Sequence, residues 1–245
     1  MEEWRILYSE SNDPYLNMAI EEAILTAVNE GKSPSTVRFW RNSRSVILGR
    51  SQNVDEEVNI KECEKYKVQI LRRFTGGGTV YQDLGNLNWT FVISRYSKFY
   101  PESFSELYEF SCNAVIEGLK EIGIDAEFRP PNSIWLKNKK VSGLAAYIKR
   151  NAVLCHGTLL VYAEIKILSK VLSKPRYEVT NIKDELKECS ISMDDIKHAI
   201  LHGIEKTYKI KVNPGDLNAY ESVLSKFLYK ERYERKSWNF KGTTS

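Results

Sequence analysis

The fold is decided by one stretch of sequence, Arg72-Arg73-Phe74-Thr75-Gly76-Gly77-Gly78. Strand-like runs lie on either side of it, at Val68–Arg72 and Thr79–Tyr81. Each glycine weakens a strand by about 0.5–1 kcal/mol relative to alanine, so three in a row suggest a backbone that another group must approach closely. Glycine also permits the positive φ angles at which successive N–H groups converge on an anion.

Two arginines precede this glycine triplet. Successive strand residues face opposite ways, so we expect one of Arg72 and Arg73 to face a ligand at the loop and the other to face away. A guanidinium beside convergent amides suits a phosphate. The segment is neither a P-loop nor a dinucleotide-binding fingerprint. A flexible turn with solvent-facing arginines is the alternative, but the second turn at Gly85-Asn86 favours a compact pocket wall.

A second chemical feature is the run Lys140-Val141-Ser142-Gly143. It follows a predicted strand, Ile134–Leu136, after a tight turn at Lys137-Asn138-Lys139. Strand alternation predicts that Lys140 and Ser142 share one face and that Val141 lies on the other. Gly143 would let a ligand or a neighbouring backbone come close. The lysine would then meet an anionic or carbonyl oxygen as a point charge; an exposed hairpin lysine is the alternative.

Histidine and cysteine residues suggest further chemistry. His156, on the predicted strand Ala152–Val161, is either a ligand contact or a core histidine. Cys155 beside it suggests a nucleophile and base, but adjacent strand residues face opposite sides, so the pair is poorly placed. His198 and His202 lie four apart on a predicted helix, yet no fourth metal ligand is evident, and we predict no metal bound by the protein's own side chains.

The remaining pattern predicts an α+β fold, in which helices flank one mixed, mainly antiparallel β-sheet. Asp13-Pro14 is typical of a helix start. Proline breaks at Lys174-Pro175 and Asn213-Pro214 could mark a smaller C-terminal subdomain. The other predicted strands are Thr36–Trp40, Ser45–Leu48 and Leu87–Ser94, and the other predicted helices are Phe104–Ile122, Ile165–Leu172, Met193–Tyr208 and Tyr220–Leu228.

Composition narrows the class of protein. The 245 residues carry a net charge of +4, with 36 basic and 32 acidic side chains, which gives no argument for nucleic acid as a partner. No apolar stretch is long enough to span a membrane, and the N-terminus lacks an apolar signal region. Cys63, Cys112, Cys155 and Cys189 share no metal-type spacing. We therefore expect a cytoplasmic protein with free thiols.

Taken together, these segments resemble the lipoate–protein ligase A family, whose fold is shared with biotin ligases and class II aminoacyl-tRNA synthetases. The likeness runs over nearly the whole chain, which predicts a single catalytic domain over residues 1–245. The segments that carry it, in order, are Asn17–Glu22, Val46–Asn53, Arg72–Asn88, Lys140–Ala145, His156–Leu160 and Tyr233–Phe240.

The resemblance implies a reaction in two steps. The lipoate carboxylate attacks the α-phosphate of ATP, giving lipoyl-AMP and pyrophosphate, and an acceptor lysine then attacks the mixed anhydride. Lys140 would bridge the phosphate and the acyl carbonyl, and Arg73 would pair with phosphate. Amides of Gly76, Gly77 and Gly78 would contact the adenylate. The other residues expected to bind substrate or nucleotide are Thr75, Tyr81, Gln82, Asn86, Asn132, Ser142, Gly143, His156 and Thr158, with Trp40, Val46 and Leu144 around the dithiolane tail.

The chain also departs from the family pattern. Gln82 stands where many members have histidine. Pro130-Pro131-Asn132-Ser133 replaces the family's Gly-Arg-Asn-Asp, which removes an aspartate that would help place Mg²⁺. The chain ends shortly after Trp238-Asn239-Phe240, where one-chain ligases continue into a small domain. We therefore expect a bipartite ligase with a separate small accessory subunit, acting on lipoyl-domain proteins such as 2-oxoacid dehydrogenase E2 or the glycine cleavage H-protein.

Two other functions compete with the ligase. An ATP-independent octanoyl or lipoyl transferase of the same superfamily would need a cysteine just before the lysine strand, where the chain has Phe128-Arg129-Pro130-Pro131. A non-catalytic module would bind lipoyl-adenylate or a lipoyl domain without turnover.

Overall fold

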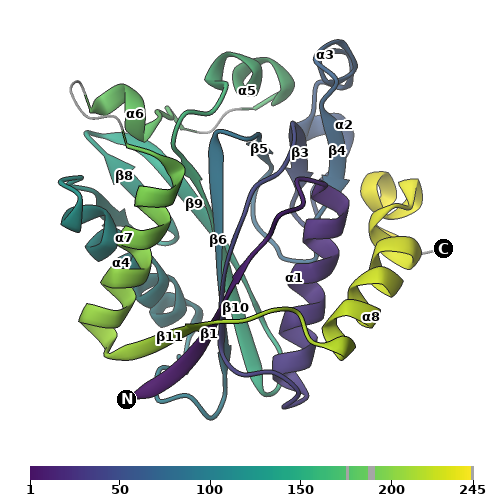
Figure 1. The fold of residues 1–245 in the computed structure, drawn as a ribbon. Coiled ribbons are helices and arrows are strands. Elements are labelled where there is room, and N and C mark those ends of the chain that lie inside the picture. Colours follow the sequence, from purple (N-terminus) through teal and green to yellow (C-terminus); the bar gives the residue numbers. More distant parts are fainter. Residues whose placement is uncertain (175–176, 187–190, 244–245) are drawn as a thin grey trace.

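The computed structural model describes residues 1–174, 177–186 and 191–243. Its centre is an eight-stranded sheet with the order β11-β1-β2-β6-β10-β9-β8-β7 (Figure 1). In this sheet β1 pairs in parallel with β2 and β11, and the other neighbours are antiparallel. The strands are β1 (Glu2–Tyr8), β2 (Thr36–Trp40), β6 (Asn86–Ser94), β7 (Glu127–Arg129), β8 (Ser133–Leu136), β9 (Lys139–Ile148), β10 (Ala152–Leu160) and β11 (Ile210–Pro214).

Three short strands form a second sheet, so the expectation of one sheet was wrong. β3 (Ser45–Leu48) lies between β4 (Gln69–Arg72) and β5 (Val80–Gln82). β4 runs parallel to β3 and β5 runs antiparallel to it. The glycine triplet lies in the connection that carries the chain from one edge of β3 to the other. The α+β class and the mainly antiparallel main sheet are confirmed.

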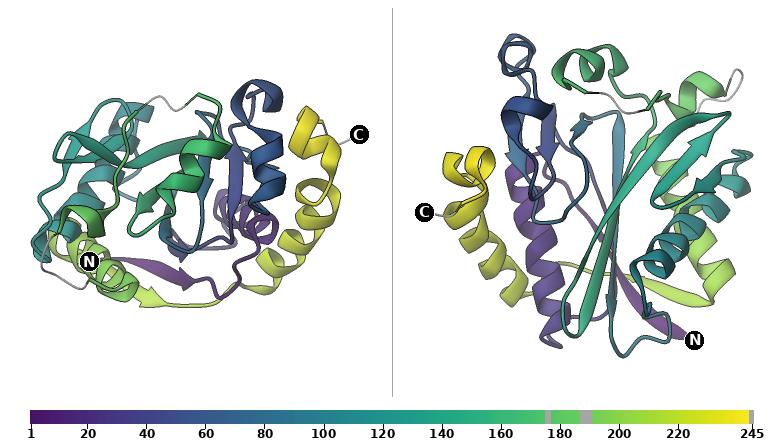
Figure 2. Two further views of the ribbon diagram at one scale, coloured as in Figure 1. Left: turned by 90° about the horizontal axis from the view of Figure 1, so that it is seen from above. Right: turned by 180° about the vertical axis from the view of Figure 1, so that it is seen from behind.

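Helices cover both faces of the main sheet (Figure 2). One face carries α4 (Phe104–Glu121) and α7 (Met193–Tyr208), which pack together where Gly118 meets Gly203. A Cβ at either glycine would come within 2.5 Å of the other helix. The opposite face carries α1 (Pro14–Asn29) and α8 (Ala219–Leu228). The remaining helices are α2 (Val54–Glu57), α3 (Ile60–Lys65), α5 (Ile165–Val171), α6 (Ile182–Glu185), η1 (Tyr229–Tyr233) and η2 (Ser237–Lys241).

Local signals in the sequence account for several boundaries. The Asp13 carboxylate caps α1 by accepting from the N–H groups of Tyr15 and Leu16. Lys137 and Asn138 have φ of 46° and 66°, as a two-residue hairpin between β8 and β9 requires. Pro214 ends β11, which joins the main sheet beside β1 and marks no separate subdomain. The other proline break, Lys174-Pro175, extends outside the described residues.

The C-terminal segment is fastened to the second sheet by Arg72. This buried side chain donates to the carbonyls of Trp238 and Phe240 and to three carbonyls after β3. Trp238 Nε1 donates to the Arg72 carbonyl in return. Arg72 therefore faces away from the glycine triplet, as alternation with Arg73 predicts.

Among the described residues, no helix is long and apolar enough to cross a membrane.

Candidate active site

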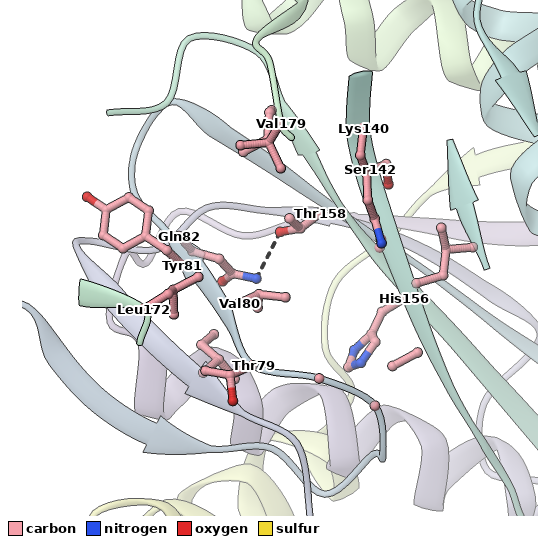
Figure 3. Close-up of a pocket in the computed structure, with 18 of the residues that line it drawn as sticks. Thr79, Val80, Tyr81, Gln82, Lys140, Ser142, His156, Thr158, Leu172 and Val179 are labelled. Atoms are coloured by element: carbon pink, nitrogen blue, oxygen red, sulfur yellow. Dashed lines mark hydrogen bonds between the residues drawn. The ribbon is translucent and has the colours of Figure 1, made fainter. Parts of the chain in front are cut away.

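A cavity of about 360 Å³ opens between the two sheets. Eleven of the fourteen residues expected at the site line it, and the exceptions are Thr75, Gly76 and Asn86. Figure 3 shows Lys140 and His156 at one side of this space, and a hydrogen bond joining Gln82 to Thr158. The lining residues from the expected set are Arg73, Gly77, Gly78, Tyr81, Gln82, Asn132, Lys140, Ser142, Gly143, His156 and Thr158.

Lys140 supplies a cation that pairs with no described acid. Its ammonium makes no hydrogen bond or ion pair with any described residue, and it lies 4.5 Å from the ring centroid of Tyr177. A Cβ at Gly143 would come within 3.2 Å of Lys140 Nζ, so this glycine leaves the space that the lysine uses. Burial lowers the pKa of Lys140. The side chain is thus a partly desolvated donor that faces a cavity.

Ser142 lies on the opposite face from Lys140, and the expected alternation was wrong. The register between β8 and β9 shifts by one residue beside Lys140, which makes Val141 the extra residue of a β-bulge. Beyond the bulge, Ser142 pairs with Ile134 and Leu159, which belong to the main core. Its Oγ is buried and unpaired within the described part of the chain. Ser142 therefore borders the cavity with its backbone.

Arg73 lies at the opposite wall, and most of its guanidinium N–H donors are taken by acceptors of the protein itself. Its Nε donates to Thr75 Oγ1 at 2.9 Å and its Nη1 to the Ile47 carbonyl at 3.1 Å. Its Nη2 donates to the carbonyls of Gly76 and Gly78 at 2.5 and 2.8 Å. No described carboxylate pairs with it, and burial lowers its pKa to about 10. Arg73 thus holds the glycine loop and adds an unneutralised charge beside the cavity.

Gly49 is a site residue to which the sequence analysis gave no role. A Cβ at this position would lie 1.9 Å from the carbonyl oxygen of Gly77. Gly77 itself has φ of 86°, where side chains are strained. The two glycines therefore let the triplet loop lie directly against the end of β3. The sequence did offer a signal for Gly49: it lies directly after a predicted strand, within the segment Val46–Asn53 that carries the family resemblance.

His156 is both a cavity residue and part of a buried network. Its Nε2 lies 2.9 Å from Thr75 Oγ1 and its Nδ1 lies 3.3 Å from Glu21 Oε2. Glu21 is fully buried and also accepts from Arg38 and Thr90. Burial opposes its charge, but these donors keep the pKa of Glu21 below its ordinary value. Burial lowers the pKa of His156, which favours the neutral ring.

The floor of the cavity is a set of buried amides and hydroxyls. Gln82 Nε2 donates to Thr158 Oγ1 at 2.9 Å, and Gln82 Oε1 accepts from Asn42 and Asn88. Thr158 also donates to Asn88. Asn86 lies behind this floor, where its side chain accepts from the N–H of Asp83 in the turn before β6. Gln82 thus takes part in a packed network at the floor of the cavity.

Apolar side chains line the rest of the cavity. Trp40 and Leu144 border it, as expected, but Val46 belongs to the core beneath the second sheet. Its neighbour Ile47 lines the cavity instead, because successive residues of β3 face opposite ways. The other apolar lining residues are Met18, Val80, Val141, Ala145, Leu160, Leu168, Leu172 and Val179.

The described cysteines lie away from the cavity. Cys63, Cys112 and Cys155 are buried in the cores and do not line it. Burial raises the pKa of the Cys155 thiol to about 12 and that of Cys63 to about 11. None of the three is placed to act as a nucleophile on a ligand in this space. Cys189 lies outside the described residues.

The described residues hold no cluster of three or more histidine, cysteine or acidic side chains that would bind a metal ion. Asn132 lines the cavity at the position beside the replaced aspartate. Its Nδ2 donates to the Leu144 carbonyl at 2.6 Å, so it fastens β9 after the bulge. Glu57 is the one carboxylate among the described lining residues.

The fold and this cavity define a class of acyl-handling enzyme, and comparison with known proteins identifies the family. Residues 13–205 match the model of the lipoyl protein ligase A/B catalytic domain, so the chain belongs to that family of lipoate ligases and transferases.

Curated relatives carry two different activities in their names. The chain is 35% identical over 197 residues to "Probable lipoate-protein ligase A" of Mycoplasma pneumoniae, covering 76% of this chain and 57% of that protein. It is 30% identical over 276 residues to octanoyltransferase LipM of Halalkalibacterium halodurans, and the match covers 98% of this chain and 100% of that protein. It is also 30% identical over 260 residues to lipoate-protein ligase A subunit 1 of Thermoplasma acidophilum, covering 97% and 96%. The chain spans about half the length of the Mycoplasma relatives it matches.

Solved structures resemble this chain over almost its whole length. A bi-partite lipoate protein ligase of Thermoplasma acidophilum, studied with its E2 lipoyl domain, gives a TM-score of 0.87 at 29% identity and covers 98% of this chain and 96% of its own. A lipoate-protein ligase A bound with ATP gives a TM-score of 0.87 at 30% identity and covers 98% of this chain and 99% of its own. A candidate lipoate protein ligase of T. acidophilum with bound lipoic acid gives 0.86 at 30% identity, covering 98% and 100%.

Proposed function

We propose that the protein is an ATP-dependent lipoate–protein ligase that works through lipoyl-AMP. The observation that carries this choice is the composition of the cavity wall. Two cations without described acid partners, Arg73 and Lys140, border the cavity, and none of the described cysteines does. A thioester-forming transferase needs a thiol there, whereas an acyl-adenylate brings the anionic phosphate that unneutralised cations favour.

The two halves of the cavity suit the two halves of that intermediate. Met18, Trp40 and Ile47 give an apolar surface suited to an acyl chain and its dithiolane ring. The glycine triplet and Lys140 lie where backbone amides and an ammonium would meet the phosphate. The solved relatives with lipoic acid and with ATP support both halves of this assignment.

In the first step the lipoate carboxylate oxygen would attack the α-phosphorus of ATP, and pyrophosphate would leave. In the second, an acceptor lysine amine would attack the acyl carbonyl carbon, and AMP would leave. Lys140 would donate to the phosphate and the carbonyl oxygen as negative charge grows on them. Gly143 gives its ammonium the space to reach both.

Mg²⁺ would be held mainly by the substrate. Glu57 is the one described carboxylate at the cavity, and Asn132 is engaged by a backbone carbonyl. The residues present therefore fit a magnesium ion that would be held by the phosphates of ATP and would offset their negative charge. The side chains that the structure describes form no site of their own for it.

Two kinds of partner follow from the relatives. Lipoyl domains, such as those of 2-oxoacid dehydrogenase E2 or the glycine cleavage H-protein, would supply the acceptor lysine. A separate accessory subunit would support adenylation, as the bi-partite relative and the near-complete match to a ligase subunit 1 suggest. We propose that the reaction takes place in the cytoplasm.

The second candidate is an octanoyltransferase, which the full-length match to LipM favours. The test is incubation of the chain with octanoylated carrier protein, followed by mass spectrometry of the intact enzyme, alongside lipoate, ATP and an apo lipoyl domain. We expect no thioester on the enzyme, efficient lipoylation of the acceptor from supplied lipoyl-AMP, and ATP-dependent lipoylation that stays weak until the accessory subunit is added. An octanoyl adduct that is absent from a Cys155→Ala or a Cys189→Ser variant would overturn the ligase proposal.

A further inference from the structure

A chain of buried polar contacts runs from α1 to the glycine triplet. It begins at Glu21, passes through His156 and Thr75, and ends at Arg73, which donates to the carbonyls of Gly76 and Gly78. Each of these polar side chains is at least nine-tenths buried. Neither Glu21 nor Thr75 lines the cavity, so both act at a distance from any ligand.

The hydrogen-bond directions within this chain are fixed by chemistry. Arg73 can only donate, so Thr75 Oγ1 accepts from its Nε at 2.9 Å. The ionised Glu21 can only accept, so the one proton of the neutral His156 ring lies on Nδ1, which faces it. Nε2 then accepts from the Thr75 hydroxyl, 2.9 Å away. Glu21 is held in place by Arg38 at 2.7 Å and Thr90 at 2.6 Å.

The far end of the chain determines how the triplet loop presents its amides. A trans peptide directs its C=O and N–H groups to opposite sides. Arg73 draws the carbonyls of Gly76 and Gly78 toward itself, so the N–H groups of Gly77 and Thr79 are turned away from it. No described group accepts from either N–H. These are donors of the kind that stabilise a developing oxyanion.

We propose that Thr75, His156 and Glu21 are positioning residues which, through Arg73, keep the triplet loop in the conformation that binds the acyl-phosphate group. The inference rests on the proposed ligase function and extends it to residues outside the reacting centre. The proposal also predicts that the rate of lipoyl transfer falls at acid pH. A proton on His156 Nε2 would face the Thr75 hydroxyl proton, so the hydroxyl would have to rotate and would lose its acceptor beside Arg73. The charged groups around the ring are Glu21, Arg38 and Arg73.

The test uses Thr75→Val, which keeps the shape of the side chain and removes the hydroxyl, with Thr75→Ser as the matched control. Lipoyl transfer from supplied lipoyl-AMP to an apo lipoyl domain is measured in single turnover. Thr75→Val should lose roughly ten- to a hundredfold, the effect of leaving buried donors and acceptors unpaired. The loss should be in the transfer rate more than in KM, and Thr75→Ser should restore most of it. Equal rates for the valine and serine variants would overturn the proposal.

His156→Gln gives an independent readout, because its amide oxygen can accept from Thr75 without titrating. The acid limb of the parent rate profile, expected below about pH 6.5, should disappear in this variant. An unchanged acid limb would contradict the relay. Hydrogen exchange of the backbone around Gly76–Gly78 separates this inference from the function. Faster exchange in Thr75→Val is expected even if the parent transfers no lipoyl group, and unchanged exchange would overturn the relay alone.

Discussion

Lys140 and Arg73 carry the same charge on opposite walls of one cavity, but their surroundings differ. The Arg73 guanidinium is fully enclosed and donates to Thr75 and to three backbone carbonyls. The Lys140 ammonium lies over Gly143 and meets no described acceptor. The difference shows that a positive charge beside a cavity can do either of two things: Arg73 shapes the loop, and Lys140 remains available to a ligand.

The difference also refines the role that the family resemblance implies for Arg73. A guanidinium whose donors are mostly taken by carbonyls has little left for a direct bond to phosphate. Its positive charge still acts across the low-dielectric wall. We therefore propose that Arg73 acts on the phosphate mainly through the amides it positions. Lys140 would act by direct contact.

The largest expected effect follows from removing the available cation. Lys140→Ala should lower lipoyl transfer from supplied lipoyl-AMP by about 10²–10³-fold, the typical effect of losing one donor to a developing oxyanion. The melting temperature should change little, because the ammonium makes no hydrogen bond or ion pair with a described residue and contacts only the Tyr177 ring. Lys139→Ala is the matched control, since its ion pairs are on the surface. Transfer by Lys140→Ala at the parent rate would show that Lys140 has no role in the chemistry.

Replacing the enclosed cation should affect the fold and the reaction together. Arg73→Lys keeps the charge but cannot reach the carbonyls of Ile47, Gly76 and Gly78 at once. Leaving such acceptors unpaired costs about 1–3 kcal/mol of unfolding free energy. Thermal unfolding should report that loss, and transfer should fall in parallel. If Arg73→Lys keeps full stability and loses only transfer, Arg73 binds the phosphate directly.

Gly49 offers a way to move the loop without touching either cation. Gly49→Ala places a Cβ 1.9 Å from the Gly77 carbonyl, so the loop must shift. We expect a stability loss of about 1–3 kcal/mol by chemical denaturation, as for other overpacked sites, and a raised KM for lipoyl-AMP. Gly76→Ala is the stability control, because its Cβ would have no neighbour within 4 Å. Equal unfolding midpoints for the two variants would argue against the close contact.

The smallest effect is expected at Cys155. This thiol faces the main core, and burial raises its pKa to about 12. Cys155→Ala should therefore transfer lipoyl groups within about twofold of the parent rate, with a stability loss on the order of 1 kcal/mol for the small cavity left behind. A loss of transfer by this variant, with an intact fold, would revive the transferase alternative.

Helices and strands with a regular pattern of apolar residues, and with turn or cap residues at their ends, could be predicted from the sequence. Thr36–Trp40, Ser45–Leu48 and Met193–Tyr208 have the predicted boundaries, since their patterns end at turn or cap residues. Most of the expected site residues do converge on one cavity, because the motifs that carry them lie on β5, β9, β10 and the loop after β4, which border the space between the two sheets.

What the sequence could not show depends on pairing between distant segments. The second sheet arises because β4 and β5 both pair with β3, which no local pattern reveals. The bulge at Val141 moved Ser142 to the other face, and a register shift of this kind depends on the neighbouring strand. Glu21 looked like an ordinary helix residue, and only the fold brings it to Arg38 and His156.

The central claim is that this cavity is built for an acyl-adenylate. Calorimetric titration of the parent chain with a non-hydrolysable lipoyl-adenylate analogue, compared with lipoate alone, tests it most directly. Because both halves of the cavity would be filled at once, the account predicts that the analogue binds at least about 100-fold more tightly, and that Lys140→Ala removes most of this gain. Equal affinity for the analogue and for lipoate would contradict it.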